Sequence, residues 1–94
     1  MPRNDTAIYA LTEVILDAVA LGQAMLDGDI TEARFRATSI VSHTESRRQE
    51  GIRDAAIEVL EYLGASGMSP KVGYGSAIDR LSQEIDKATD HTMH

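Results

Sequence analysis

The chain has 94 residues, a formal net charge of -6 and no cysteine. Its length suits one small domain, and the missing cysteines exclude disulfides, thiol catalysis and Cys-ligated zinc. The negative charge disfavours nucleic-acid phosphates and anionic membranes as partners. A hydrophobic fraction of 43% with only 4% aromatic residues favours closely packed helices over a β-sandwich.

The first predicted helix spans about residues 6–27, with Asn4 and Asp5 as candidate N-caps and Gly28 as a left-handed stop. Wound at about 100° per residue, its apolar side chains cover an arc of about 200°. A surface helix needs a stripe of only about 100°. The extra width predicts either a central helix or one that also packs against a second chain. The arc comprises Ala7, Ile8, Ala10, Leu11, Val14, Ile15, Ala18, Val19, Leu21, Met25 and Leu26.

The second predicted helix spans about residues 30–48, with Asp29 as its N-cap and Glu32 completing an acidic capping box. Residues 42–51 contain no aliphatic side chain. This polar segment is either the exposed end of that helix followed by a turn near Gly51, or part of one long helix. Because glycine inside a helix costs about 1 kcal/mol relative to alanine, the turn is favoured.

A third helix is predicted over residues 52–63 and ends at Gly64. Gly, Ser and Pro then predict a loop over residues 64–75, whose backbone we expect to be mobile. Ser76 is the expected N-cap of a fourth helix over residues 76–89, and residues 90–94 are expected to fray. Four helices with short connections predict an all-α fold: a four-helix bundle or an orthogonal helical array, formed as a single domain from residues 1–94.

His43 is the only histidine away from the C-terminal tail, and its polar surroundings predict an exposed ring. Its place late in the second helix, with Gly51 and the pair Leu60-Glu61 further on, resembles histidine phosphotransfer domains. That resemblance implies a four-helix bundle in which His43 accepts a phosphoryl group. The family's lysine and the small residue after it are replaced here by Ser46 and Arg47.

The other polar groups are expected to have structural roles. Glu13 and Asp17 are predicted on the solvated side of the first helix, and a metal site at His91 and His94 would lack fixed ligands in a frayed tail. Neither a metal nor a cofactor is therefore expected. Acidic residues are interleaved with a group of arginines, which predicts local ion pairs and leaves open a docking site for an acidic partner. This group comprises Arg34, Arg36, Arg47, Arg48 and Arg53.

The sequence shows no set of titratable groups that would converge in an active site, so we do not predict an enzyme. The sequence predicts a small cytoplasmic interaction or regulatory module that forms a homodimer through its first helix, with no nucleic acid or membrane partner and with another protein as a further candidate partner. The expected interface residues are Ile8, Leu11, Ile15 and Val19. The alternative function is a phosphotransfer-like carrier that uses His43.

Overall fold

The computed structural model describes residues 2–44 and 49–93, with side chains described for residues 9–44 and 49–90. Helix α1, Pro2–Asp27, ends at Gly28, whose φ of 74° is the left-handed conformation that glycine adopts without steric cost. The N–H of Gly28 donates to the Met25 carbonyl, and that of Asp29 donates to the Ala24 carbonyl. These two bonds form a Schellman motif, which confirms the predicted stop.

Helix α2, Ile30–His43, begins as predicted at Asp29, whose carboxylate accepts a hydrogen bond from the Glu32 N–H. The reciprocal half of the capping box is absent, because the Asp29 N–H already donates to Ala24 and the Glu32 carboxylate accepts from Arg36. The helix ends at His43 and not near residue 48. Thr44 caps it, fully buried, with its hydroxyl donating to the Ile40 carbonyl.

Helix α3, Glu50–Leu63, is separate from α2, as the turn interpretation expected. Gly51 lies inside α3 and not in the turn, and its missing Cβ leaves room for the Glu84 carboxylate. Gly64 ends α3 with a φ of 75°. Helix α4, Tyr74–Met93, begins before the predicted Ser76 cap and continues through most of the predicted frayed tail. Asn4 and Asp5 likewise lie inside α1, which begins at Pro2, a residue that suits the first helical position.

The linker between α3 and α4 is held by Arg34, a contact that the sequence did not predict. The Arg34 guanidinium donates to the carbonyl oxygens of Gly64, Ala65 and Met68 at 2.8, 2.7 and 3.1 Å, and to that of Leu63 at 3.3 Å. The Lys71 N–H also donates to the Tyr62 carbonyl. The first half of the linker is therefore anchored to the bundle. The Lys71 contact ties the second half to α3 as well, so the mobility predicted for residues 65–75 stays a prediction.

Replacing Arg34 with alanine is expected to accelerate amide exchange at Met68 and Lys71 by about tenfold or more, since one hydrogen bond to a charged group contributes about 1.5–3 kcal/mol. Hydrogen exchange measured by NMR checks this. Arg36→Ala is the control, because Arg36 lies on the same helix but contacts α1. Equal exchange rates in the Arg34→Ala variant and the wild type would show that Arg34 does not restrain the linker.

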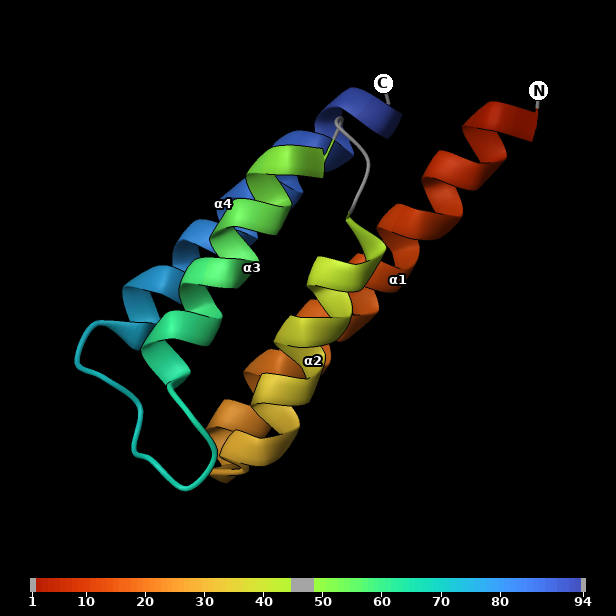
Figure 1. Ribbon diagram of the computed structural model, residues 1–94. Helices are drawn as coiled ribbons and strands as arrows, with labels where there is room; N and C mark the ends of the chain where they lie inside the picture. The colour runs from red at the N-terminus through yellow and green to blue at the C-terminus, as the bar shows by residue number, and fades with distance from the viewer. Residues whose placement is uncertain (1, 45–48, 94) are drawn as a thin grey trace.

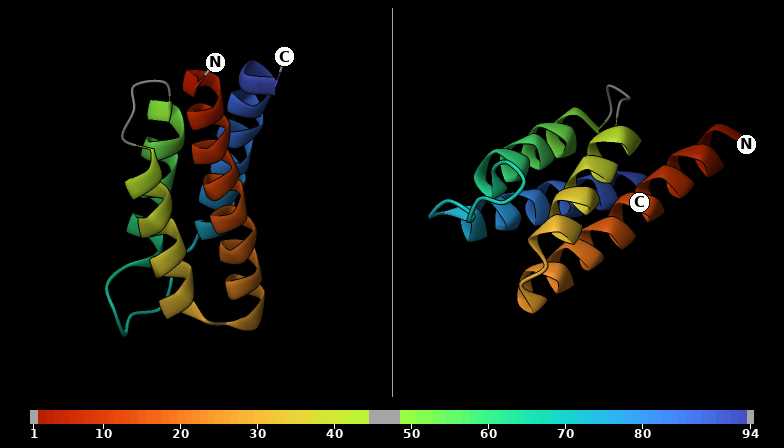
Figure 2. Two further views of the ribbon diagram at one scale, coloured as in Figure 1. Left: turned by 90° about the vertical axis from the view of Figure 1, so that its right-hand side faces the viewer. Right: turned by 60° about the horizontal axis from the view of Figure 1, so that its bottom comes forward.

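The four helices alternate in direction, and α1 and α2 form one hairpin while α3 and α4 form the other (Figure 1). Each helix contacts the next along the chain, and α1 closes the circle with a smaller contact to α4. The two termini lie at one end and the linker at the other (Figures 1 and 2). The all-α four-helix bundle predicted from the sequence is confirmed, and the described residues contain no strand.

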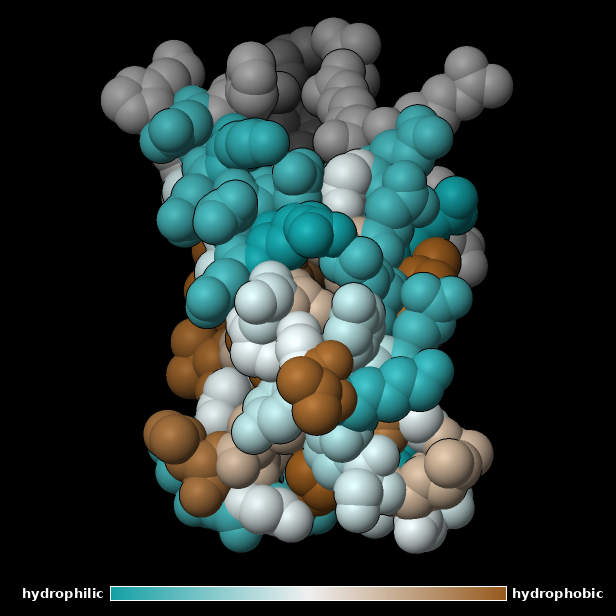
Figure 3. Space-filling view, turned by 90° about the vertical axis from the view of Figure 1, so that its left-hand side faces the viewer, coloured by the Kyte–Doolittle hydropathy of each residue, from teal (hydrophilic) through white to brown (hydrophobic). Residues whose placement is uncertain are grey.

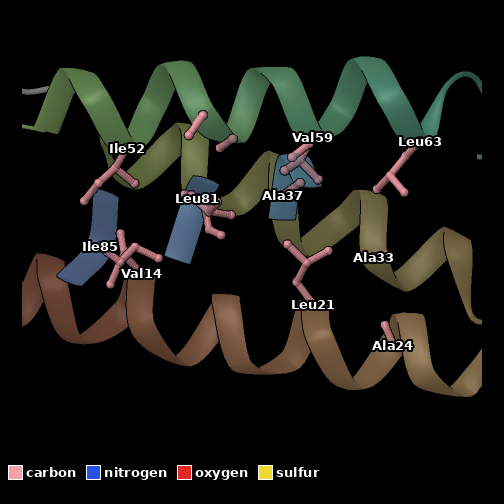
Figure 4. Packing of buried hydrophobic residues seen from close by; sticks show 14 of the residues in the cluster. Val14, Leu21, Ala24, Ala33, Ala37, Ile52, Val59, Leu63, Leu81 and Ile85 are labelled. Carbon is pink, nitrogen blue, oxygen red and sulfur yellow. The ribbon is translucent and has the colours of Figure 1, made fainter. Parts of the chain in front are cut away.

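Small and branched aliphatic side chains fill the space between the hairpins (Figure 4). Alanines Ala33 and Ala37 of α2 and Ala24 of α1 are buried, and their small size permits a close approach between these helices. Larger aliphatic side chains fill the rest of the core. The largest that are fully buried include Leu11, Val14, Leu21, Ile40, Ile52, Val59, Leu63 and Leu81.

Candidate functional site

The side of α1 that faces away from the bundle carries four large apolar side chains, which we call the outer stripe. Tyr9, Leu16, Val19 and Leu26 are 72%, 58%, 68% and 84% exposed. Figure 2 (left) looks at this side, with α1 in front between α2 and α4. Single exposed apolar residues are ordinary, whereas a contiguous row of them is a candidate interaction surface.

The four residues predicted to form the dimer interface do not share one exposed surface. Leu11 is 2% exposed and belongs to the core, so it is unavailable to a partner. Ile15 is half-buried and packs against the core. Only Val19 is fully on the outer side, and the side chain of Ile8 lies outside the described residues.

Sequence reasoning missed Leu16 and Tyr9 for a physical reason. Both lie outside the predicted arc, because they alternate along the helix with the polar residues Thr12 and Gln23. The predicted interface residues Leu11, Ile15 and Val19 instead range from buried to exposed. Only the positions of α2 and α4 show which side of α1 is covered, although the intervals of seven, three and seven residues between Tyr9, Leu16, Val19 and Leu26 were visible in the sequence.

The opposite side of the molecule has no comparable apolar row among its described residues. In Figure 3 its upper part is mostly hydrophilic, and its apolar side chains are scattered over the lower part. A shallow hollow of about 450 Å³ lies between α3 and α4, with Ile57 on its rim. Two of its carboxylates are neutralised, because Glu58 pairs with Arg80 and Glu84 pairs with Lys87.

A second candidate site lies where α1 meets α2. Asp17 is only 5% exposed, which corrects the prediction that it lies on a solvated face; Glu13 is exposed as predicted. The Asp17 carboxylate accepts hydrogen bonds from the Ser39 hydroxyl at 2.7 Å and from Arg36 Nη1 at 3.0 Å. These bonds satisfy its charge, as a buried carboxylate requires.

His43 lies beside this cluster, and its side chain is 41% exposed, as predicted. Its Nδ1 is 2.9 Å from the backbone carbonyl oxygen of Ser39 and 3.6 Å from Asp17 Oδ2. Because a carbonyl oxygen can only accept, Nδ1 must carry a proton. In the neutral ring Nε2 therefore holds the lone pair, which is the arrangement that a histidine nucleophile needs.

The arginines are engaged in ways that the sequence predicted only in part. Arg36 forms the expected pair with Glu32, and its bonds to Glu32 and then Asp17 raise its pKa. Arg34 binds backbone carbonyls and not a carboxylate. Arg53 Nε is buried with no hydrogen-bond partner in the described part of the chain. Arg47 and Arg48 lie outside the described residues.

No group of three His, Asp or Glu side chains within the described residues could hold a metal ion. The side chains of His91 and His94 lie outside that part of the chain. The segment Tyr9–Asp27 has the length and composition of a membrane-crossing helix, properties that core helices of soluble proteins and signal sequences share.

Comparison with protein-family models, with curated proteins and with solved structures finds no match to this chain. The function must therefore be argued from the site itself. Two features support an argument: the outer stripe of α1 and the exposed His43 ring beside the buried Asp17.

Proposed function

We propose that the protein is a small, non-enzymatic cytoplasmic interaction module that forms a homodimer through α1. The outer stripe is the observation that supports this proposal, because it leaves large apolar side chains in water along most of one helix. Burial of apolar surface stabilises a complex by about 25 cal/mol per Å² before the costs of association are subtracted. A small domain buries a limited fraction of its own surface, so dimerisation adds burial that the fold lacks.

A dimer held by the outer stripe is expected to dissociate when a charge is placed at Val19. Val19→Glu would bury an unpaired carboxylate in the interface, and the dissociation constant should rise by about tenfold or more, since each 1.4 kcal/mol of lost interaction changes it tenfold. Because Val19 is exposed in the single chain, the variant should keep its fold. Light scattering over a range of concentrations measures the dissociation constant, and circular dichroism checks that the fold is kept.

Val72→Glu is the matched control, since it makes the same substitution at a linker position that is 98% exposed. It should leave the dimer intact. A wild-type protein that stays monomeric at millimolar concentration would refute self-association. Equal dissociation of both variants would show that added charge weakens the dimer wherever it is placed.

The geometry of His43 supports a second candidate function, a phosphoryl carrier. In this reaction the Nε2 lone pair of His43 attacks the phosphorus of an aspartyl phosphate on a receiver domain. An N–P bond forms, and the donor's carboxylate leaves. The carboxylate of Asp17, 3.6 Å from Nδ1, would stabilise the positive charge on the phosphorylated ring.

Incubation with a panel of phosphorylated receiver domains tests this second function, with mass spectrometry to detect acid-labile phosphohistidine. A carrier would show a stoichiometric adduct in the wild type that is absent from His43→Ala. The interaction module predicts no adduct in either protein and an unchanged dimer in His43→Ala. An adduct that persists in His43→Ala would place the chemistry on another residue.

A further inference from the structure

The outer stripe belongs to a longer, regular row on α1. Its four members and two polar residues, Thr12 and Gln23, follow one another at alternating spacings of three and four positions. All six are exposed. In order they are Tyr9, Thr12, Leu16, Val19, Gln23 and Leu26. This is the a and d spacing of heptad repeats, with Tyr9, Leu16 and Gln23 at a positions and the other three at d.

The spacing of this row indicates the shape of the partner that would pack along it. Positions that repeat every seven residues drift around a straight α-helix by about 20° per heptad. Another helix that winds around α1 with a left-handed twist keeps contact along the whole row. At about 1.5 Å per residue the row is roughly 26 Å long, which requires a partner helix of at least that length.

The composition of the row indicates which kind of helix would pair with it. The row contains no charged residue, and the sequence has neither Lys nor Arg between Arg3 and Arg34. An anionic membrane surface attracts helices that carry Lys and Arg, which this part of the chain lacks. The row instead complements an uncharged row of the same length and spacing, which a second copy of α1 provides.

We propose that the outer stripe pairs with the outer stripe of a second copy in the antiparallel direction, about a two-fold axis. The midpoint of the row lies between Leu16 and Val19. Reversing one helix therefore places Tyr9 opposite Leu26 of the second copy, and Leu16 opposite its Val19. In the same arrangement Thr12 faces Gln23, so every apolar side chain meets an apolar one and the two polar side chains meet each other.

The parallel arrangement is less favourable for two reasons. Parallel two-stranded coiled coils prefer a β-branched residue at a and leucine at d, whereas the centre of this row has Leu16 at a and Val19 at d. Antiparallel pairing places a opposite d, so each central layer combines one leucine with one valine. It also opposes the macrodipoles of the two α1 helices, which a parallel pair would align.

The antiparallel arrangement rests on the proposed homodimer. Cysteine cross-linking tests the relative direction of the two α1 helices. Because the natural chain has no cysteine, an introduced thiol is the only one present. Tyr9→Cys and Leu26→Cys are prepared separately and then mixed under mild oxidation. Antiparallel pairing predicts that the mixture gives at least about tenfold more disulfide-linked dimer than either variant alone, because a disulfide requires Cα atoms within about 7 Å.

Glu61→Cys, on the exposed side of α3, gives the background from random collisions. Efficient cross-linking of Tyr9→Cys alone and of Leu26→Cys alone would demonstrate the parallel arrangement and overturn the proposal while leaving the dimer in place. Cross-linking at the background level in all samples, with a dimeric mass, would place the interface away from the outer stripe. A monomeric mass for the uncross-linked protein would refute the proposed function itself.

Discussion

Leu11→Ala is expected to lower the free energy of unfolding by about 2–5 kcal/mol, since truncating a buried leucine removes its burial and leaves a cavity. Leu11 is 2% exposed and lies where α1 faces the bundle core. For a small domain this is a large share of a total of about 5–15 kcal/mol. Thermal and urea unfolding followed by circular dichroism measure the change.

Leu26→Ala is the matched control, because it makes the same substitution on the same helix at a site that is 84% exposed. Leu11→Ala should destabilise the protein at every concentration, because its contacts lie within one chain. Leu26→Ala should alter the melt only at concentrations where the protein dimerises. Similar, concentration-independent losses for both variants would contradict the division of α1 into a core side and an outer side.

Asp17→Ala is expected to cost about 1.5–3 kcal/mol, the contribution of a hydrogen bond to a charged group, because the Ser39 hydroxyl loses its carboxylate acceptor. Loss of the bond to Arg36 adds less, since that guanidinium remains accessible to water and paired with Glu32. Urea unfolding measures the change. Asp17→Asn, which keeps an acceptor oxygen for Ser39, should lose less.

Glu13→Ala tests whether the loss at Asp17 depends on burial. Glu13 is an exposed carboxylate one turn earlier on α1, and its replacement should change the stability by no more than about 0.5 kcal/mol. A loss at Glu13 as large as that at Asp17 would indicate that the charge of α1, and not the buried hydrogen bonds, is the stabilising factor.

The helices and their order were predictable because their ends are encoded locally. Gly28 and Gly64 adopt the left-handed conformation that stops a helix, and Asp29 caps α2 with its own side chain. The starts of α1 and α4 were predicted two to four residues late. The Asp5 carboxylate is favourable both at an N-cap and in the first turn, and Pro2 suits the first helical position, so these residues do not fix one start for α1.

The site could be predicted only in outline. The wide apolar arc correctly indicated a helix with more apolar surface than the core needs, but not which side chains remain outside. The burial of Asp17 depends on Arg36 and Ser39, which come from another helix and lie far along the sequence. The exposure of His43 was predicted from its polar neighbours, whereas its bond to the Ser39 carbonyl required coordinates.

The Arg34 contacts are expected to form late in folding. Consecutive helices contact each other across short connections, so these contacts form early. Arg34 instead connects α2 to carbonyls about thirty positions further along the chain, and it reaches them only after α2 and α3 have docked. Interactions that form after the transition state slow unfolding and leave the folding rate nearly unchanged. Arg34 is therefore expected to contribute mainly to the lifetime of the folded bundle.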